Sequence, residues 1–208
     1  MFKGFNQVNV YVEGQGIVRK TIEVNKGKIA SINDDKNNDL EKLNDNLIVV
    51  PGFIDKHIHG ANHSDGMYPT FDDIANIAKT IASEGVSSFL VTTMTQSREN
   101  IDAALLNIRK YIEANVSEGA TALGIHLEGP FICTKYKGAQ PEEYIVPCNV
   151  DVFKHYQETC GNNIKQVTLA YEEDGKELVR YLKSQGVVAS IGHTNATSEQ
   201  TLEGIKDY

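Results

Sequence analysis

The chain has 208 residues, 40% of them hydrophobic and 23% charged, a composition typical of a globular protein with a substantial core. A formal net charge of −8, without a local run of Lys and Arg, argues against a nucleic-acid partner. No apolar run approaches the ~18 residues of a membrane span. The 3 cysteines form no C-x-x-C pair, so we expect structural thiols in a cytoplasmic protein.

Residues 1–50 predict a small β-rich unit. Apolar and polar residues alternate in QVNVYVEG, IVRKTIEV and KIASIND, a pattern typical of half-buried strands. The polar stretch DDKNNDLEKLNDN follows the third of these strands.

Residues 51–208 predict alternating strands and helices. We expect strands in LIVVPGFID, SSFLVTTM, ATALGIHLE, KQVTLAYE and VVASIGH, and helices over residues 71–83, 98–115, 150–159 and 175–184, with a further helix beginning near the end. Thr70 and Thr197 each precede an acidic or amide residue by three positions, as helix N-caps do. Such a succession indicates an α/β fold with a parallel sheet.

The number of units leaves two interpretations of this fold. A (β/α)8 barrel needs about 250 residues, so the chain is either an unusual fold or a barrel truncated inside its fifth helix at Tyr208. No glycine-rich phosphate loop follows any predicted strand, which weakens a nucleotide-binding fold.

Histidines and one carboxylate gather at the predicted strand ends. His57 and His59 alternate on one strand and therefore share a face, Glu128 ends the third strand of the series, and His193 ends the fifth. Active sites of parallel barrels form at the carboxyl ends of the strands. Imidazole with carboxylate suits Zn or Fe better than Mg or Ca. A lone H-x-H pair is weak evidence, but the shared position predicts these four residues as metal ligands.

The other histidines have different expected roles. His126 shares a face with Glu128 but has no partner visible in the sequence, so we expect a structural role for it. His63 is expected at the surface of a loop, and His155 is expected to be exposed on an amphipathic helix.

Four motifs carry a resemblance to a known family. VVPGFIDKHIHG resembles the first-strand signature of the amidohydrolase superfamily, and GIHLEGPFI, KGAQ and SIGHTNAT together resemble the N-acetylglucosamine-6-phosphate deacetylases. The resemblance runs along the whole chain and covers about the first half of a typical member. It implies a TIM-like (β/α)8 metal-dependent hydrolase barrel, truncated after five βα units, with a small N-terminal β-sandwich segment completed by both chain ends.

The resemblance also implies roles for individual residues. Glu128 and His193 would be metal ligands, and the intact His57 and His59 favour a second position, giving one or two divalent ions, Zn or Fe. Carbamylated relatives need a lysine at the fourth strand end, which is missing here.

Two further implied positions lie in the KGAQ motif. Ala139 and Gln140 would contact substrate, although many members have histidine in place of Gln140. We expect Gln140 to affect the KM for substrate and not metal loading.

The implied activity belongs to a longer protein. It is hydrolysis of the acetamide of N-acetylglucosamine 6-phosphate to glucosamine 6-phosphate and acetate. The expected binding partner is this small amino-sugar phosphate, and the full-length protein is expected to be a homodimer. A second metal-site histidine and the general acid/base aspartate would lie beyond Tyr208, so no catalytic residue is expected here and residues 1–208 alone should be inactive and poorly soluble. The alternatives are a deacetylase of an epimeric amino-sugar phosphate and an inactive metal-binding fragment.

Overall fold

The computed structural model describes residues 2–208, which divide into two compact units between Gly52 and Phe53. This division falls close to the predicted boundary between residues 50 and 51. None of the helices in residues 2–208 has the length and apolar character needed to cross a membrane.

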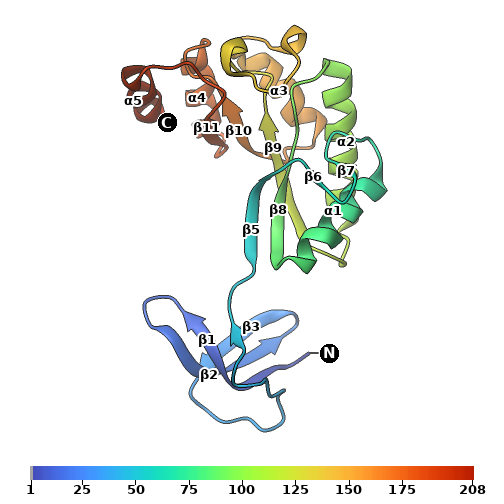
Figure 1. Cartoon of the computed structure of the whole chain (residues 1–208), viewed down its shortest axis with the longest axis vertical. Coiled ribbons are helices and arrows are strands. Elements are labelled where there is room, and N and C mark those ends of the chain that lie inside the picture. Colours follow the sequence, from blue (N-terminus) through green and yellow to red (C-terminus); the bar gives the residue numbers. More distant parts are fainter. Residues whose placement is uncertain (1) are drawn as a thin grey trace. The chain divides into compact units, whose positions relative to one another are not determined.

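The N-terminal unit contains a small β-sheet (Figure 1). Its four strands have the order β3-β2-β1-β4. Its strands are β1 (Gly4–Val12), β2 (Gly16–Asn25), β3 (Lys28–Asn33) and β4 (Ile48–Val49). The first three pair antiparallel and β4 runs parallel to β1. Because side chains alternate across a strand, Val8 and Val10 face the same side and pack with Ile22 in a small core.

The second unit contains a five-stranded parallel sheet with the order β11-β10-β9-β8-β5 (Figure 1). Its strands are β5 (Phe53–Ile58), β8 (Val86–Thr92), β9 (Thr121–Glu128), β10 (Ile164–Leu169) and β11 (Val188–Ile191). Its helices are α1 (Phe71–Ser83), α2 (Arg98–Ala114), α3 (Val150–Thr159), α4 (Gly175–Ser184) and α5 (Ser198–Asp207). Strand order follows chain order, with a helix between each strand and the next, which confirms the predicted α/β class.

The loops at the carboxyl ends of β5 and β9 contain short elements of their own. The loop after β5 forms a small hairpin of β6 (Gly60–Ala61) and β7 (Ser64–Asp65). The loop after β9 contains two 3-10 turns, at Thr134–Tyr136 and Glu142–Tyr144. These loops border the site described below.

The core of the second unit lies between the sheet and helices α1 to α4. In α1, Ile74, Ile77 and Ile81 are buried, and their spacing of three and four residues places them on one face of the helix. Phe89 of β8 and Ile125 of β9 pack in the same cluster. The three cysteines are free and buried, as expected for structural thiols.

Local signals predicted both helix starts correctly. The Thr70 hydroxyl accepts a hydrogen bond from the Asp73 amide at 3.3 Å. Thr197 and Gln200 form a reciprocal capping box at the start of α5.

Two predicted strands differ from the observed ones. LIVVPGFID is not one strand, because β4 ends at Val49 and β5 begins at Phe53, with Pro51 and Gly52 between them. Proline lacks the amide hydrogen that a strand ladder needs, so this break has a local cause. The last strand ends at Ile191, so His193 lies in the following turn and not in the strand.

Candidate metal centre

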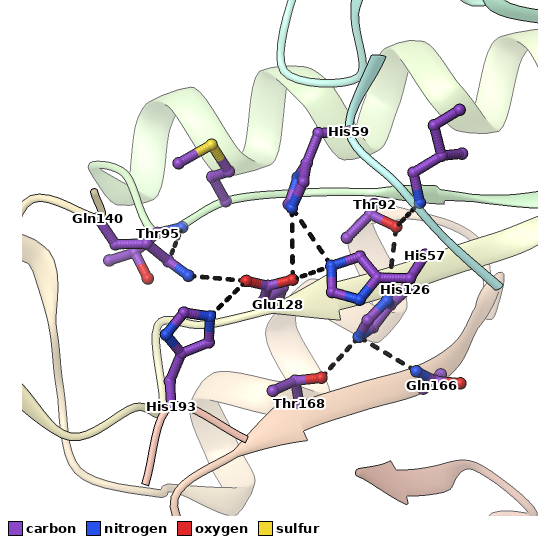
Figure 2. Close-up of polar contacts among 12 residues, drawn as sticks. His57, His59, Thr92, Thr95, His126, Glu128, Gln140, Gln166, Thr168 and His193 are labelled. Carbon is purple, nitrogen blue, oxygen red and sulfur yellow. Dashed lines mark hydrogen bonds and ion pairs between the residues drawn. The ribbon is translucent and has the colours of Figure 1, made fainter. Parts of the chain in front are cut away.

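The carboxylate of Glu128 lies at the centre of the site, and its two oxygens face different histidines (Figure 2). His57 Nε2 contacts Glu128 Oε2, and His59 Nε2 lies 3.4 Å from the same oxygen. His193 Nε2 lies 2.8 Å from Oε1. The structure therefore brings together the four residues that the sequence predicted as metal ligands.

The two histidines of the H-x-H pair are held by the carboxyl end of β5. Ile58 lies between them, and its amide donates a hydrogen bond to Thr92 Oγ1 at 2.9 Å. This bond joins the end of β5 to the end of β8. With the backbone extended, His57 and His59 turn to the same side, and their Nε2 atoms lie 3.3 Å apart.

His193 is held from both its backbone and its ring. Just before it, the Gly192 amide donates to the Leu169 carbonyl at 3.1 Å, and His193 itself has a left-handed φ of 49°. Its carbonyl accepts from the Cys133 amide at 2.8 Å. Its Nδ1 lies 2.9 Å from the Tyr136 carbonyl oxygen, which can only accept, so Nδ1 carries the proton and Nε2 is left to act as a ligand.

Glu172 supports the turn that follows His193. Its carboxylate accepts a hydrogen bond from the Thr194 hydroxyl at 2.5 Å and another from the Asn195 amide. The loop after β10 therefore helps to hold the third histidine of the site.

The electrostatics favour an ionised Glu128. Burial by itself would raise the pKa of this carboxyl, but its polar contact with His59 and the charge of His57 outweigh burial and lower the pKa to about 2. The same contact with Glu128 raises the pKa of His59, against the opposing effect of burial. His126, behind the site, has its pKa lowered to about 4, first by burial and then by the charge of His57. His126 is therefore neutral at pH 7.

This arrangement fits a divalent metal ion. Ligand atoms of His57, His59 and Glu128 all lie within 4.8 Å of one another. Within residues 2–208, Glu128 Oε2 and His59 Nδ1 are buried side-chain atoms that make no hydrogen bond. A buried carboxylate oxygen that faces two ring nitrogens is well placed to share a cation with them, and imidazole with carboxylate is a ligand set for Zn or similar ions.

His126 has partners that the sequence did not reveal. Its Nε2 lies 2.7 Å from Thr168 Oγ1 and 3.3 Å from the side-chain Nε2 of Gln166, and its Nδ1 lies 3.4 Å from Thr92 Oγ1. Thr92 also accepts from Ile58, so His126 connects β9 to β8, β10 and the end of β5. The expected structural role is consistent with these contacts.

The register of the sheet explains why these partners meet. Thr92 and Gln166 are both opposite His126, and Thr168 is opposite Glu128. The signal available in the sequence was a threonine near the end of each neighbouring strand, but this signal becomes specific only when the register is known.

The remaining histidines lie away from the centre. His63 is exposed, as expected. His155 is half-buried, and its Nε2 lies 2.8 Å from Asp102 Oδ1 in α2. The expectation that His155 is simply exposed was wrong, because α3 packs beside α2 and brings the two residues together.

The loop after β9 brings Gln140 against the site. Gln140 is buried, and its Nε2 donates to Glu128 Oε1 at 3.0 Å. Its Oε1 accepts from the Thr95 amide at 2.8 Å. Ala139, next to it, is exposed. Sequence reasoning missed both contacts of Gln140, and the substrate roles of Gln140 and Ala139 stay predictions.

The model of the amidohydrolase family matches residues 48–207. The chain belongs to the amidohydrolase family. The match begins just before β5 and includes all four predicted ligands, so the candidate metal centre lies within the family domain.

Individual amidohydrolase relatives give a narrower comparison. The N-acetylglucosamine-6-phosphate deacetylase of Bacillus subtilis (strain 168) is 40% identical over 207 residues, which cover 96% of this chain and 52% of the relative. The N-acetylgalactosamine-6-phosphate deacetylase of Escherichia coli O157:H7 is 34% identical over 155 residues, covering 74% and 41%. The chain thus spans about half the length of these curated relatives or less.

A solved structure supports the same fold. The N-acetylglucosamine-6-phosphate deacetylase of Pasteurella multocida superposes with a TM-score of 0.87 at 25% identity, covering 100% of this chain and 55% of that one. The parallel sheet and helices of the second unit are therefore those of an amidohydrolase barrel.

Proposed function

We propose that the whole protein removes the acetyl group of N-acetylglucosamine 6-phosphate by metal-dependent hydrolysis, giving glucosamine 6-phosphate and acetate. The observation that carries this proposal is the convergence of three imidazole nitrogens on the buried, ionised Glu128. This group lies at the carboxyl ends of parallel strands, where enzymes with this architecture act. The names of the relatives support the identity of the sugar.

We propose His57, His59, Glu128 and His193 as the residues that hold one or two ions of Zn or Fe. Two positions are supported by the separate surroundings of the Glu128 oxygens, since Oε1 faces one histidine and Oε2 faces two. A bound divalent ion polarises an amide carbonyl and lowers the pKa of a water molecule towards about 7.

The chain's own residues would prepare this centre. Glu128 supplies the negative charge that balances a cation in a buried place. The backbone carbonyl of Tyr136 orients the His193 ring by accepting a hydrogen bond from Nδ1. Ala139 is exposed on the loop beside the site, which suits the substrate contact proposed for it. The homodimeric state and cytoplasmic location stay predictions.

A second candidate is deacetylation of the epimeric N-acetylgalactosamine 6-phosphate. The E. coli relative named for that reaction is 34% identical over 155 residues, so the same centre could serve either sugar. The two substrates differ at one hydroxyl group, and their acetamides present the same bond to the site.

Acetate release from both sugar phosphates is the direct test. The whole protein is assayed after removal of metal with a chelator and again after addition of Zn²⁺ or Fe²⁺. We expect turnover of the glucosamine derivative only in the reconstituted protein. Preference for the galactosamine derivative would favour the second candidate, and equal turnover without metal would contradict the metal-dependent mechanism.

A further inference from the structure

Gln140 is a buried amide with both of its polar atoms engaged. The residue is 2% exposed. Its backbone closes a turn, because its amide donates to the Lys137 carbonyl at 3.2 Å, and the Lys137 ammonium donates to the Gln140 carbonyl at 3.2 Å. This turn fixes where the side chain enters the site, and the side chain then reaches Glu128 and Thr95 (Figure 2).

The orientation of this amide follows from its partners. The backbone amide of Thr95 can only donate, so it must face the oxygen of Gln140, at 2.8 Å. The NH₂ group is then directed at Glu128 Oε1, which can only accept while the carboxyl is ionised. Rotating the amide by half a turn would point its NH₂ group at the Thr95 N–H and its oxygen at Glu128 Oε1. Both contacts would then be repulsive, so Thr95 determines which group Gln140 directs at Glu128.

The surrounding backbone leaves this arrangement little freedom. Gly129 follows Glu128 directly and has a φ of +72°. A Cβ atom at Gly129 would lie 2.0 Å from Thr95 Oγ1 and 3.0 Å from Gln140 Oε1. Thr95, Gly129 and Gln140 therefore pack too closely for any side chain at residue 129.

We propose that Gln140 is a positioning residue that holds the Glu128 carboxylate in the orientation needed for metal ligation, a role that rests on the proposed metal centre. Its hydrogen bond occupies one side of Oε1, beside His193, and so limits rotation of the carboxylate. Oε2 is thereby kept towards His57 and His59. The principal effect of Gln140 is on metal affinity, in contrast to the substrate effect predicted from the sequence.

The test compares metal binding by two glutamine variants. Gln140→Met keeps the length of the side chain but removes both hydrogen bonds. Zn²⁺ affinity is measured by competition with a chromophoric chelator, and the Co²⁺-substituted protein is examined by absorption spectroscopy. We expect Gln140→Met to bind Zn²⁺ about 10- to 100-fold more weakly, the usual effect of losing a partner that orients a ligand, and to change the Co²⁺ spectrum.

Gln157 offers a matched control. Its side-chain oxygen accepts from the Ile164 amide at 2.9 Å and its nitrogen donates to the Ile164 carbonyl at 3.2 Å, at the amino end of β10. Gln157→Met likewise removes one accepted and one donated hydrogen bond, but at the end of β10 opposite to the metal centre. We expect it to lower the unfolding midpoint and to leave Zn²⁺ affinity and the Co²⁺ spectrum unchanged.

A second variant keeps the inference testable if Gln140→Met does not fold. Gln140→His retains a ring N–H that can donate to Glu128, so we expect its Zn²⁺ affinity and Co²⁺ spectrum to stay near those of the wild-type protein. A folded Gln140→His protein that bound Zn²⁺ about 10- to 100-fold more weakly would overturn the inference. Unchanged Zn²⁺ affinity in folded Gln140→Met, with a raised KM for the sugar phosphate, would overturn the positioning role but leave the proposed function intact. A wild-type protein that binds no metal would overturn the proposed function itself.

Discussion

Glu128 is ionised at neutral pH although it is buried, and this is the principal feature of the site at the scale of single residues. Burial alone would raise the pKa of the carboxyl, yet contacts with His59 and His57 lower it to about 2. Three ring nitrogens and one amide group surround the two oxygens. Such a concentration of ligand atoms is costly to assemble unless a cation is bound there.

Replacement of Glu128 by glutamine tests this assignment. Glu128→Gln keeps the shape of the side chain but removes its charge, so we expect loss of tightly bound metal and of acetate release. Metal content is measured by elemental analysis of the purified protein. Glu118→Gln is the control, because Glu118 is an exposed carboxylate paired with Lys79. Full metal content in Glu128→Gln would show that the site is assigned wrongly.

Thr92 and Thr93 are neighbouring buried threonines that differ in their hydrogen bonds. Thr92 accepts from the Ile58 amide at 2.9 Å, whereas the equally buried Thr93 hydroxyl makes no hydrogen bond with the described residues. Thr92→Val strands a buried donor and should lower the free energy of unfolding by about 1–3 kcal/mol. Thr93→Val should be nearly neutral. Urea unfolding of both variants is the measurement, and equal losses would contradict the role of the Thr92 bond.

At the scale of elements, Tyr171 joins the end of β10 to α5. Tyr171 is buried, and its hydroxyl donates to Asp207 Oδ2 at 2.6 Å. Arg180 in α4 donates to Asp207 Oδ1 at 2.8 Å, so three segments meet at one carboxylate. A Cβ on Gly204 would lie 3.0 Å from the Tyr171 ring, which shows how closely α5 approaches. Tyr171 thus has a packing role here.

This contact makes the attachment of α5 depend on pH. The Tyr171 hydroxyl, with help from Arg180, lowers the pKa of Asp207 despite the opposing effect of burial. A lowered pKa means that this stabilisation is complete above the unfolded value of about 3.9 and is lost as pH falls through the lower folded value. We therefore expect Asp207→Asn to reduce the urea midpoint at pH 7, and the difference from wild type to shrink at pH 3.

Tyr171→Phe provides the control for this pH dependence. In that background Asp207 lacks its principal partner, so Asp207→Asn should have a smaller effect at pH 7. An undiminished effect would mean that the pH dependence does not arise from the Tyr171 contact.

At the scale of the whole molecule, the site draws on the full width of the sheet in the second unit. His57 comes from the end of β5 at one edge and His59 follows that strand directly. Glu128 comes from the central β9, and His193 from the turn after β11 at the other edge. In a flat sheet, four strand spacings of ~4.8 Å would separate the edges by roughly 19 Å. Contact of both edges with one carboxylate therefore requires the sheet to curl.

Metal binding should consequently stabilise the unit of residues 53–208 as a whole. A ligand that binds only the folded state adds about 2.7 kcal/mol to the free energy of unfolding at 100 times its Kd. We expect urea unfolding to show an increase of this size when Zn²⁺ is added at that concentration. Glu128→Gln should show no increase, and an equal increase in that variant would place the stabilising ion elsewhere.

Features that depend only on neighbouring residues could be predicted from the amino-acid sequence. Periodicity of two and of 3.6 residues predicted the strands and helices, and Thr70 and Thr197 marked helix starts correctly, because a cap contacts its own first turn. The position of His57, His59 and Glu128 at strand ends also predicted a shared site, since parallel strands end at one edge of a sheet.

Contacts between side chains that are far apart in the sequence depend on how the elements pack in three dimensions. Gln140 contacts Thr95 across 45 positions, His155 contacts Asp102 across 53, and His126 finds its partners on two neighbouring strands. Periodicity reports the face on which a side chain lies, but not the register of neighbouring strands or the path of a long loop. These depend on how helices and sheet pack together, and that packing placed the amide of Gln140 against the carboxylate at the centre of the site.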